Sequence, residues 1–177
     1  MNKYPYDIFS TRFGWIGVLY SNNGLRFCVL KRTASQAFEA IKAEAMESSL
    51  IASSETYVKA ILQQYMSGVE DNLRLITIDL IGQSTFYSDA WKACRNIPLG
   101  QTRSYTWVAN KIGRPRSQRA VGRAMASNPI PIVIPCHRVI RSDGSTGGYS
   151  GGGPDIKNKL LALEGEMESC NGPSLLR

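Results

Sequence analysis

Histidine is almost absent from this chain of 177 residues: His137 is the only one. The four cysteines, Cys28, Cys94, Cys136 and Cys170, lie far apart, and no two of them form a CxxC pair. A zinc site of cysteine and histidine needs closely spaced ligands of both kinds, so we expect no metal site. Disulfides are rare in reducing compartments. We therefore expect Cys28 and Cys94 in the core and Cys170 as a thiol of the C-terminal tail.

Long hydrophobic runs are also missing. No apolar stretch is long enough to span a bilayer. The first residues lack the positively charged lead and the apolar run of a signal peptide. The hydrophobic content of 43% nevertheless allows a real core, in one medium domain or two small ones. We expect a soluble protein with no membrane partner, located in the cytoplasm, or in the nucleus of a eukaryote.

Acidic residues are missing from the stretch between Ala90 and Ser142, which carries ten basic ones. The net charge of +7 comes entirely from residues 84–177, because residues 1–83 carry eight basic and eight acidic side chains. A block of one sign outside a disordered tail indicates a polyanionic partner. The alternative is a solvated basic face without a partner. The ten basic residues are Lys92, Arg95, Arg103, Lys111, Arg114, Arg116, Arg119, Arg123, Arg138 and Arg141.

Residues 1–83 show the pattern of a small α+β domain. The dipeptide Asn23-Gly24 favours a tight hairpin between two apolar runs. Thr33 followed by Gln36 is typical of a helix start. The predicted elements are strands at 15–20 and 25–31, helices at 33–45 and 57–65, a strand at 76–80, and a linker at 82–84.

Residues 84–177 are mostly helical by their periodicity. Two helices that meet at Gly113-Arg114-Pro115 form a candidate helix-turn-helix, and we expect Ser117 to cap the second one. Gly122 inside that helix costs about 1 kcal/mol relative to alanine; its small face suits a close approach, to a ligand or to another helix. The predicted elements are helices at 86–97, 104–112 and 117–126, an extended segment at 128–140, a glycine-rich loop at 142–153, and a short helix at 156–163.

The dipeptide Cys136-His137 is the chemically suggestive feature of the chain. A thiol is a weak nucleophile until a base removes or holds its proton. The only histidine directly follows this cysteine, between an apolar run and a glycine-rich loop. The pair therefore indicates an activated nucleophile. The alternative is a buried, inert cysteine beside a surface histidine.

Residues 128–139, NPIPIVIPCHRV, resemble the active-site signature of the O6-alkylguanine-DNA alkyltransferases. Four other segments are similar to that family as well: Ser104-Tyr105, RAVGRAM at 119–125, GGYSGG at 147–152 and LLALEG at 160–165. The likeness is collinear over 85–165. It implies an α+β protein of two domains: a small sheet with helices, ribonuclease H-like, at 1–83, and a mainly helical, winged-helix-like domain with a helix-turn-helix at 84–177.

The resemblance implies direct DNA repair by a methylated-DNA–[protein]-cysteine S-methyltransferase that is consumed in one turnover. Cys136 would attack and keep the alkyl group of O6-alkylguanine, with O4-alkylthymine as a further substrate. His137 would act as base through a bound water, and Glu164 would orient His137. Tyr105 would give a proton or a hydrogen bond to the guanine ring nitrogen N3, and Asn128 would brace the turn at the active site. No cofactor is implied.

The same resemblance implies that the protein, a monomer, binds double-stranded DNA and flips the damaged base out of the stack. Arg119 would fill the space left behind, and the helix around Gly122 would enter the minor groove. The residues that would line the base pocket or contact DNA are Ser117, Arg119, Gly122, Arg123, Met125, Pro131, Val139, Tyr149, Ser150 and Lys157.

Two other functions compete with this one. A non-enzymatic DNA-binding regulator would explain the basic block and the helix-turn-helix, but not Cys136-His137 or Glu164. A cysteine hydrolase would explain the nucleophile, but its base comes from a histidine distant in sequence, and the chain has no second histidine. Loss of repair on removal of Cys136 separates the first alternative from a transferase, and turnover of acyl substrates identifies the second.

Overall fold

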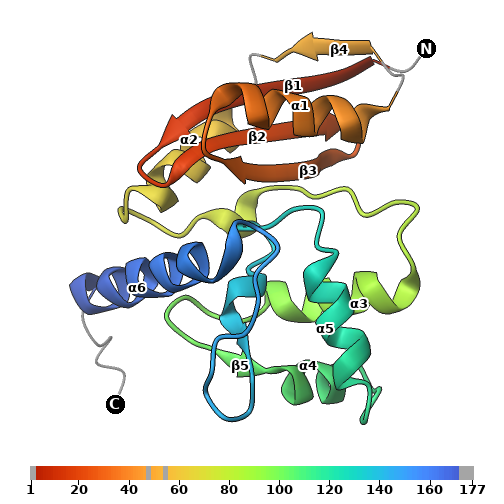
Figure 1. The fold of residues 1–177 in the computed structure, drawn as a ribbon, viewed down its shortest axis with the longest axis vertical. Helices are drawn as coiled ribbons and strands as arrows, with labels where there is room; N and C mark the ends of the chain where they lie inside the picture. The colour runs from red at the N-terminus through yellow and green to blue at the C-terminus, as the bar shows by residue number, and fades with distance from the viewer. Residues whose placement is uncertain (1–2, 47–48, 54–55, 172–177) are drawn as a thin grey trace.

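The computed structural model describes residues 3–46, 49–53 and 56–171. A four-stranded sheet with helices packed on it forms one end of the molecule, and a group of short helices forms the other (Figure 1). One hydrophobic cluster runs through both parts, from Phe9 in the sheet to Met167 in the C-terminal helix. No helix among the described residues is long and apolar enough to cross a membrane.

The sheet begins with three antiparallel strands, β1 (Lys3–Thr11), β2 (Gly14–Ser21) and β3 (Gly24–Lys31). The hairpin between β2 and β3 confirms the prediction from Asn23-Gly24. A short strand, β4 (Ser49–Ala52), pairs with β1 in parallel, which gives the order β3-β2-β1-β4. The sequence analysis predicted neither β1 nor β4.

Helix α1 (Ala34–Ala45) covers one face of the sheet, and its start confirms the predicted cap, because the Thr33 side chain accepts a hydrogen bond from the Gln36 backbone N–H at 3.2 Å. The helix approaches closely at Gly17 of β2, where a Cβ would lie 2.9 Å from the Ile41 side chain. Helix α2 (Thr56–Met66) places Tyr65 in the cluster that contains the opposite face of the sheet.

The strand predicted at 76–80 is only an isolated bridge, between Ile78 and Leu25, after the short 3-10 helix η1 (Leu73–Leu75). The outer edge of β3 explains this result, because its hydrogen bonds are divided between two segments. Leu25 bonds Thr77 and Asp79, whereas the Cys28 N–H donates to the Pro129 carbonyl at 2.9 Å. The 76–80 segment therefore has no full strand edge to pair with.

The second part confirms the predicted helices: α3 (Thr85–Arg95), α4 (Tyr105–Lys111) and α5 (Gln118–Ala126). Two-residue strands β5 (Arg103–Ser104) and β6 (Val139–Ile140) pair in parallel beneath them. The Ser104 hydroxyl caps α4 through the Trp107 N–H at 3.1 Å. Ser117 is the N-cap residue of α5, as predicted, but its hydroxyl makes no capping hydrogen bond and donates to the Arg114 carbonyl instead, at 2.6 Å.

The last helix, α6 (Gly153–Asn171), is longer than predicted at both ends and continues through Gly165. A glycine inside a helix costs about 1 kcal/mol relative to alanine. Met167, beyond Gly165, is buried at 2% exposure, and its packing against the core offsets that cost. Cys170, predicted as a tail thiol, therefore belongs to the helical backbone, and residues 172–177 lie outside the described residues.

Candidate functional site

The turn between α5 and the 3-10 helix η2 (Cys136–Arg138) fixes the position of the cysteine. Asn128 is the brace: its amide donates to the Ile134 carbonyl at 2.8 Å and to Cys136 Sγ at 3.1 Å, and its oxygen accepts from the Ile130 N–H. Ile132 inside this turn has a φ of 76°. A β-branched residue in that region costs about 1–3 kcal/mol and persists only where the surroundings enforce it. The turn is thus held in a strained form by packing and by one asparagine.

Cys136 lies at a cavity of about 270 Å³ and is only 3% exposed. Burial raises the pKa of its thiol to about 11, although the Asn128 hydrogen bond and the positive charge of Lys157 partly oppose that rise. The thiol is therefore protonated at neutral pH, and a base is needed to make it nucleophilic. The residues that line the cavity are Tyr105, Gly122, Met125, Ala126, Cys136, Gly148, Tyr149 and Ser150.

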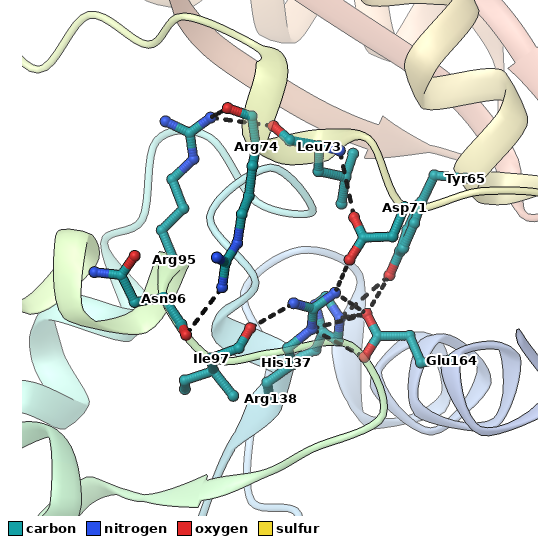
Figure 2. Close-up of polar contacts among 10 residues, drawn as sticks. All are labelled: Tyr65, Asp71, Leu73, Arg74, Arg95, Asn96, Ile97, His137, Arg138 and Glu164. Atoms are coloured by element: carbon teal, nitrogen blue, oxygen red, sulfur yellow. Dashed lines mark hydrogen bonds and ion pairs between the residues drawn. The ribbon is translucent and has the colours of Figure 1, made fainter. Parts of the chain in front are cut away.

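His137 is fully buried and points away from solvent into a network centred on Glu164 of α6 (Figure 2). Its Nε2 lies 2.8 Å from Glu164 Oε1. Arg138 forms a two-atom contact with the same carboxylate, through Nε and a terminal nitrogen at 2.7–3.0 Å. A second terminal nitrogen of Arg138 donates to the Ile97 carbonyl at 2.7 Å. The predicted His137–Glu164 contact is present, and Arg138 is part of it.

The charges of this network are set by burial and by these contacts. Burial alone would raise the pKa of Glu164, but the hydrogen bonds and charges of His137 and Arg138 outweigh it and lower that pKa to about 2. Burial also lowers the pKa of His137, and the Glu164 carboxylate only partly compensates. At neutral pH the network therefore holds a carboxylate, a guanidinium and a neutral imidazole.

The tautomer of His137 follows from its neighbours. Glu164 is ionised and only accepts hydrogen bonds, so the short contact requires a proton on Nε2. That leaves Nδ1 without a proton. Nδ1 is buried and has no hydrogen-bond partner within the described part of the chain. An unprotonated, unpartnered ring nitrogen on the residue that follows a protonated thiol has the protonation state that a general base needs.

The sequence analysis missed two members of this network, both from the first part of the chain. Tyr65 of α2 donates to Glu164 Oε1 at 2.6 Å, and Asp71 accepts from Arg138 at 3.1 Å (Figure 2). Neither residue belongs to a motif, and only the fold brings Tyr65 to Glu164 and Asp71 to Arg138. The basic block also needs a correction: Arg138 is buried in this network, and Arg95 donates to the carbonyls of 73, 74 and 76, so these two cations serve the protein itself.

A second hollow, of about 330 Å³, opens beside the cysteine cavity and shares Tyr105, Gly122 and Gly148 with it. Arg119 from α5 and Arg141 after β6 both line this groove and are exposed. Within the described part of the chain, the one side chain near the position that a Cβ on Gly122 would take is the Tyr105 ring, at 3.9 Å. The groove therefore carries positive charge, and it joins the cysteine cavity at the residues they share on and around α5.

Four of the residues predicted to line the pocket or contact DNA do not line the cysteine cavity. Lys157 is fully buried, and its ammonium donates to the carbonyls of Val139 and Thr146, so it ties β6 to the glycine-rich loop. Pro131 and Val139 are buried and, among the described residues, are not part of the cavity lining. Arg123 is exposed on α5 outside both hollows.

Side chains that could bind a metal ion are scattered in the fold. Within residues 3–46, 49–53 and 56–171, no group of three or more histidine, cysteine, aspartate or glutamate side chains could hold a metal ion. The three cysteines described with side chains, Cys28, Cys94 and Cys136, are all buried and unpaired with one another.

Both the sequence and the fold are similar to those of known O6-methylguanine DNA methyltransferases and methylated-DNA–protein-cysteine methyltransferases. The family described as "6-O-methylguanine DNA methyltransferase, DNA binding domain" matches residues 85–166. A methylated-DNA–protein-cysteine methyltransferase of Cricetulus griseus is 36% identical over 174 residues, which cover 92% of this chain and 83% of that protein. The crystal structure of Mycobacterium tuberculosis OGT in complex with DNA superposes with a TM-score of 0.77 at 31% identity, over 92% of this chain and 94% of that one.

The extent of the likeness varies among these relatives. The methylated-DNA–protein-cysteine methyltransferase of Mus musculus is 56% identical over 75 residues, which are 42% of this chain and 36% of the mouse protein. The chain therefore spans about a third of that relative. The strongest identity falls in a short segment, while the weaker likeness extends through both parts of the fold.

Proposed function

The chain belongs to the methylated-DNA–protein-cysteine methyltransferase family, and from this premise we propose that it repairs O6-alkylguanine in DNA by moving the alkyl group onto Cys136. One observation carries the proposal: Cys136 lies at a cavity that shares three residues with a positively charged groove along α5. The similar M. tuberculosis structure is a complex with DNA, which supports DNA as the partner. We extend the substrate class to O4-alkylthymine on the family resemblance alone.

The proposed reaction balances without a cofactor. The bond between the alkyl carbon and guanine O6 breaks as a bond between that carbon and Cys136 Sγ forms. The electron pair stays with guanine, which takes up one proton, and the thiol gives up one. The products are guanine and a thioether, so no oxidant, reductant or metal enters the balance. Since the thioether is stable, each molecule acts once.

The proposed proton path uses the network around Glu164. A thiol whose pKa is about 11 needs a base at neutral pH, and the unprotonated, unpartnered Nδ1 of His137, on the next residue, is the candidate. We propose that a bound water links the two. Glu164 would then stabilise the imidazolium that forms, as the carboxylate does in a catalytic triad. Tyr105, whose pKa is raised by burial, would remain protonated and serve the leaving guanine.

The proposed DNA contacts follow from the groove. A base in a duplex reaches a pocket only when it is flipped out, at a cost of a few kcal/mol. Arg119 would occupy the gap in the stack, and the unobstructed backbone at Gly122 would allow α5 into the minor groove. Met125, Tyr149 and Ser150 would contact the extrahelical base in the cavity. Phosphate contacts from the basic surface make binding salt-dependent and tolerant of sequence.

The domain types, the oligomeric state and the location of the protein are also proposed. We propose a ribonuclease H-like domain at 1–83, which the order β3-β2-β1-β4 and the parallel β1–β4 pair support, and a winged-helix-like domain at 84–177. We also propose that the protein works as a monomer where DNA is found, in the cytoplasm or in a eukaryotic nucleus. Size-exclusion chromatography with light scattering tests the monomer.

Intact-protein mass spectrometry tests the proposed function. After mixing with a duplex that contains one O6-methylguanine, we expect the protein mass to rise by that of one methylene, in stoichiometric yield and on the peptide that contains Cys136. A duplex with unmodified guanine is the control and should leave the mass unchanged. Tight binding of the alkylated duplex with no mass change would favour a DNA-binding regulator, and turnover of acyl substrates would favour a hydrolase.

Arg119→Ala is expected to slow transfer from duplex DNA by about tenfold to a hundredfold, because part of the flipping cost of a few kcal/mol is then no longer offset. A single-stranded oligonucleotide needs no flipping, so its rate should change by less than about threefold. The measurement is the rate of transfer from both substrates at low protein excess. Lys111→Ala, which removes an exposed positive charge at the end of α4, is the matched control. Equal losses with both substrates would contradict the role.

A further inference from the structure

Glu164 Oε1 is the most contacted atom of the site, and one of its partners comes from the first part of the chain. It accepts from His137 Nε2 at 2.8 Å, from Arg138 at 2.7 and 3.0 Å, and from the Tyr65 hydroxyl at 2.6 Å. Tyr65 is fully buried on α2 and reaches the carboxylate from outside the segment that carries the cysteine (Figure 2). The Tyr65–Glu164 hydrogen bond is short and buried, so it affects the charge on the carboxylate as well as the packing of α2.

The geometry fixes the direction of the hydrogen bonds. A phenol has one proton, and the Tyr65 oxygen lies 2.6 Å from Glu164 Oε1 but 3.3 Å from His137 Nε2. The proton therefore goes to the carboxylate, and the Tyr65 lone pairs face the Nε2–H group of the histidine. The imidazole is held between two oxygens, of Glu164 and of Tyr65, each of which accepts and neither of which offers it a proton.

We propose that Tyr65 is a positioning residue that keeps His137 in its neutral, Nε2-protonated form with Nδ1 free to act as base. This inference rests on the proposed function only for its effect on transfer. The mechanism is charge sharing: the phenol proton draws negative charge from the Glu164 oxygen that faces the imidazole, so the carboxylate attracts a second proton to the ring less strongly. A residue of the first part of the chain thus helps to set the protonation state of His137.

Other charged and titratable groups around His137 do not replace Tyr65 in this role. Arg138 of η2 contacts Glu164, and Asp71, before η1, accepts hydrogen bonds from Arg138 and from the Leu73 N–H. Lys157 of α6 acts on His137 through its charge alone, and the Tyr149 ring stands edge-on at 6.2 Å. Burial and the nearby Glu164 carboxylate raise the pKa of Tyr65 well above its ordinary value, so it stays a neutral donor.

Tyr65→Phe tests the proposal, because it removes the hydroxyl and keeps the buried ring. His137 is the only histidine, so in protein without an affinity tag the imidazole nitrogens are the sole signals of their kind in ¹⁵N NMR. Since burial lowers the pKa of His137, we expect a neutral Nε2–H ring in the wild type at neutral pH. In Tyr65→Phe we expect the titration midpoint of His137 to rise and the acidic limb of the transfer rate to move to higher pH with it.

Tyr57→Phe is the matched control, since Tyr57 lies on the same helix and is 46% exposed. It should leave the histidine signals and the transfer rate unchanged. A Tyr65→Phe protein that is folded and shows wild-type histidine signals overturns the proposal, whatever its transfer rate. If the wild type shows no transfer to DNA at all, the NMR comparison still decides on Tyr65, so the two proposals fail separately.

Discussion

Transfer is expected to be lost completely in a Cys136→Ala variant, while the affinity for an alkylated duplex changes by no more than about 0.5 kcal/mol. The thiol sulfur is the proposed acceptor of the alkyl group, and among the described residues that line the cavity no other group is a comparable nucleophile. The substitution leaves the brace in place, because the Asn128 amide that contacts Sγ also donates to the Ile134 carbonyl. Intact mass after reaction and fluorescence anisotropy of a labelled duplex measure the two quantities.

Cys94→Ala is the matched control for this experiment. Cys94 is also fully buried, and burial raises the pKa of its thiol well above the ordinary value, but it does not line the cavity among the described residues. It should retain stoichiometric transfer if it folds. Alkylation of Cys136→Ala at Cys94 or Cys28 would show that the acceptor has been assigned to the wrong sulfur.

The reactive centre could be predicted from the sequence because its signal is local. Cys136 and His137 are adjacent, the basic block is contiguous, and the turn at 113–115 separates two clear helical patterns. Asn128 is eight residues before the cysteine that it contacts. Patterns over such short separations survive in sequence, and a family signature adds the distant Glu164.

Tyr65 and Asp71 could not be found in this way. Tyr65 is 72 residues from His137 and 99 from Glu164, and a single tyrosine on an amphipathic helix is indistinguishable from any core aromatic residue. Only the docking of α2 beside α6 gives its hydroxyl a partner. Arg138 misled the sequence analysis for the same reason: within a block of cations it resembles a phosphate contact, and its burial depends on a carboxylate 26 residues away.

The missed strand β1 had a usable signal. Tyr4, Tyr6 and Ile8 alternate and pack with the cluster under α1. Pro5, between them, suggests an irregular segment, since proline donates no backbone hydrogen bond. The opposite error occurred at 76–80, where real alternation exists but β3 gives part of its edge to Pro129. Alternation indicates which faces a segment presents and cannot show whether a partner edge is available.

Arg138→Met is expected to lower the free energy of unfolding at pH 7 by about 3–5 kcal/mol, because it leaves Glu164 as a buried charge with too few partners. The side chains of Arg138 and Glu164 are 3% and 1% exposed, so solvent cannot replace the guanidinium. Methionine fills much of the same volume, which limits the cavity term. Urea unfolding followed by circular dichroism measures the change. Arg141→Met, at an exposed position of the same segment, should change stability by about 0.5 kcal/mol or less.

The dependence of this loss on pH separates charge from packing. In the wild type the pKa of Glu164 is lowered from 4.5 to about 2, so the carboxylate contributes stability that is fully present above pH 4.5 and is lost as pH falls toward 2. Without Arg138, we expect burial to dominate and to raise the pKa of Glu164. Protonation of Glu164 at acidic pH then removes the buried charge that destabilises the variant. The stability difference between the two proteins should therefore shrink from pH 7 to pH 4, and a constant difference would mean that lost packing is the cause. Adding Glu164→Gln to Arg138→Met removes the unpaired charge and should recover most of the loss at pH 7, since a neutral amide needs no buried cation.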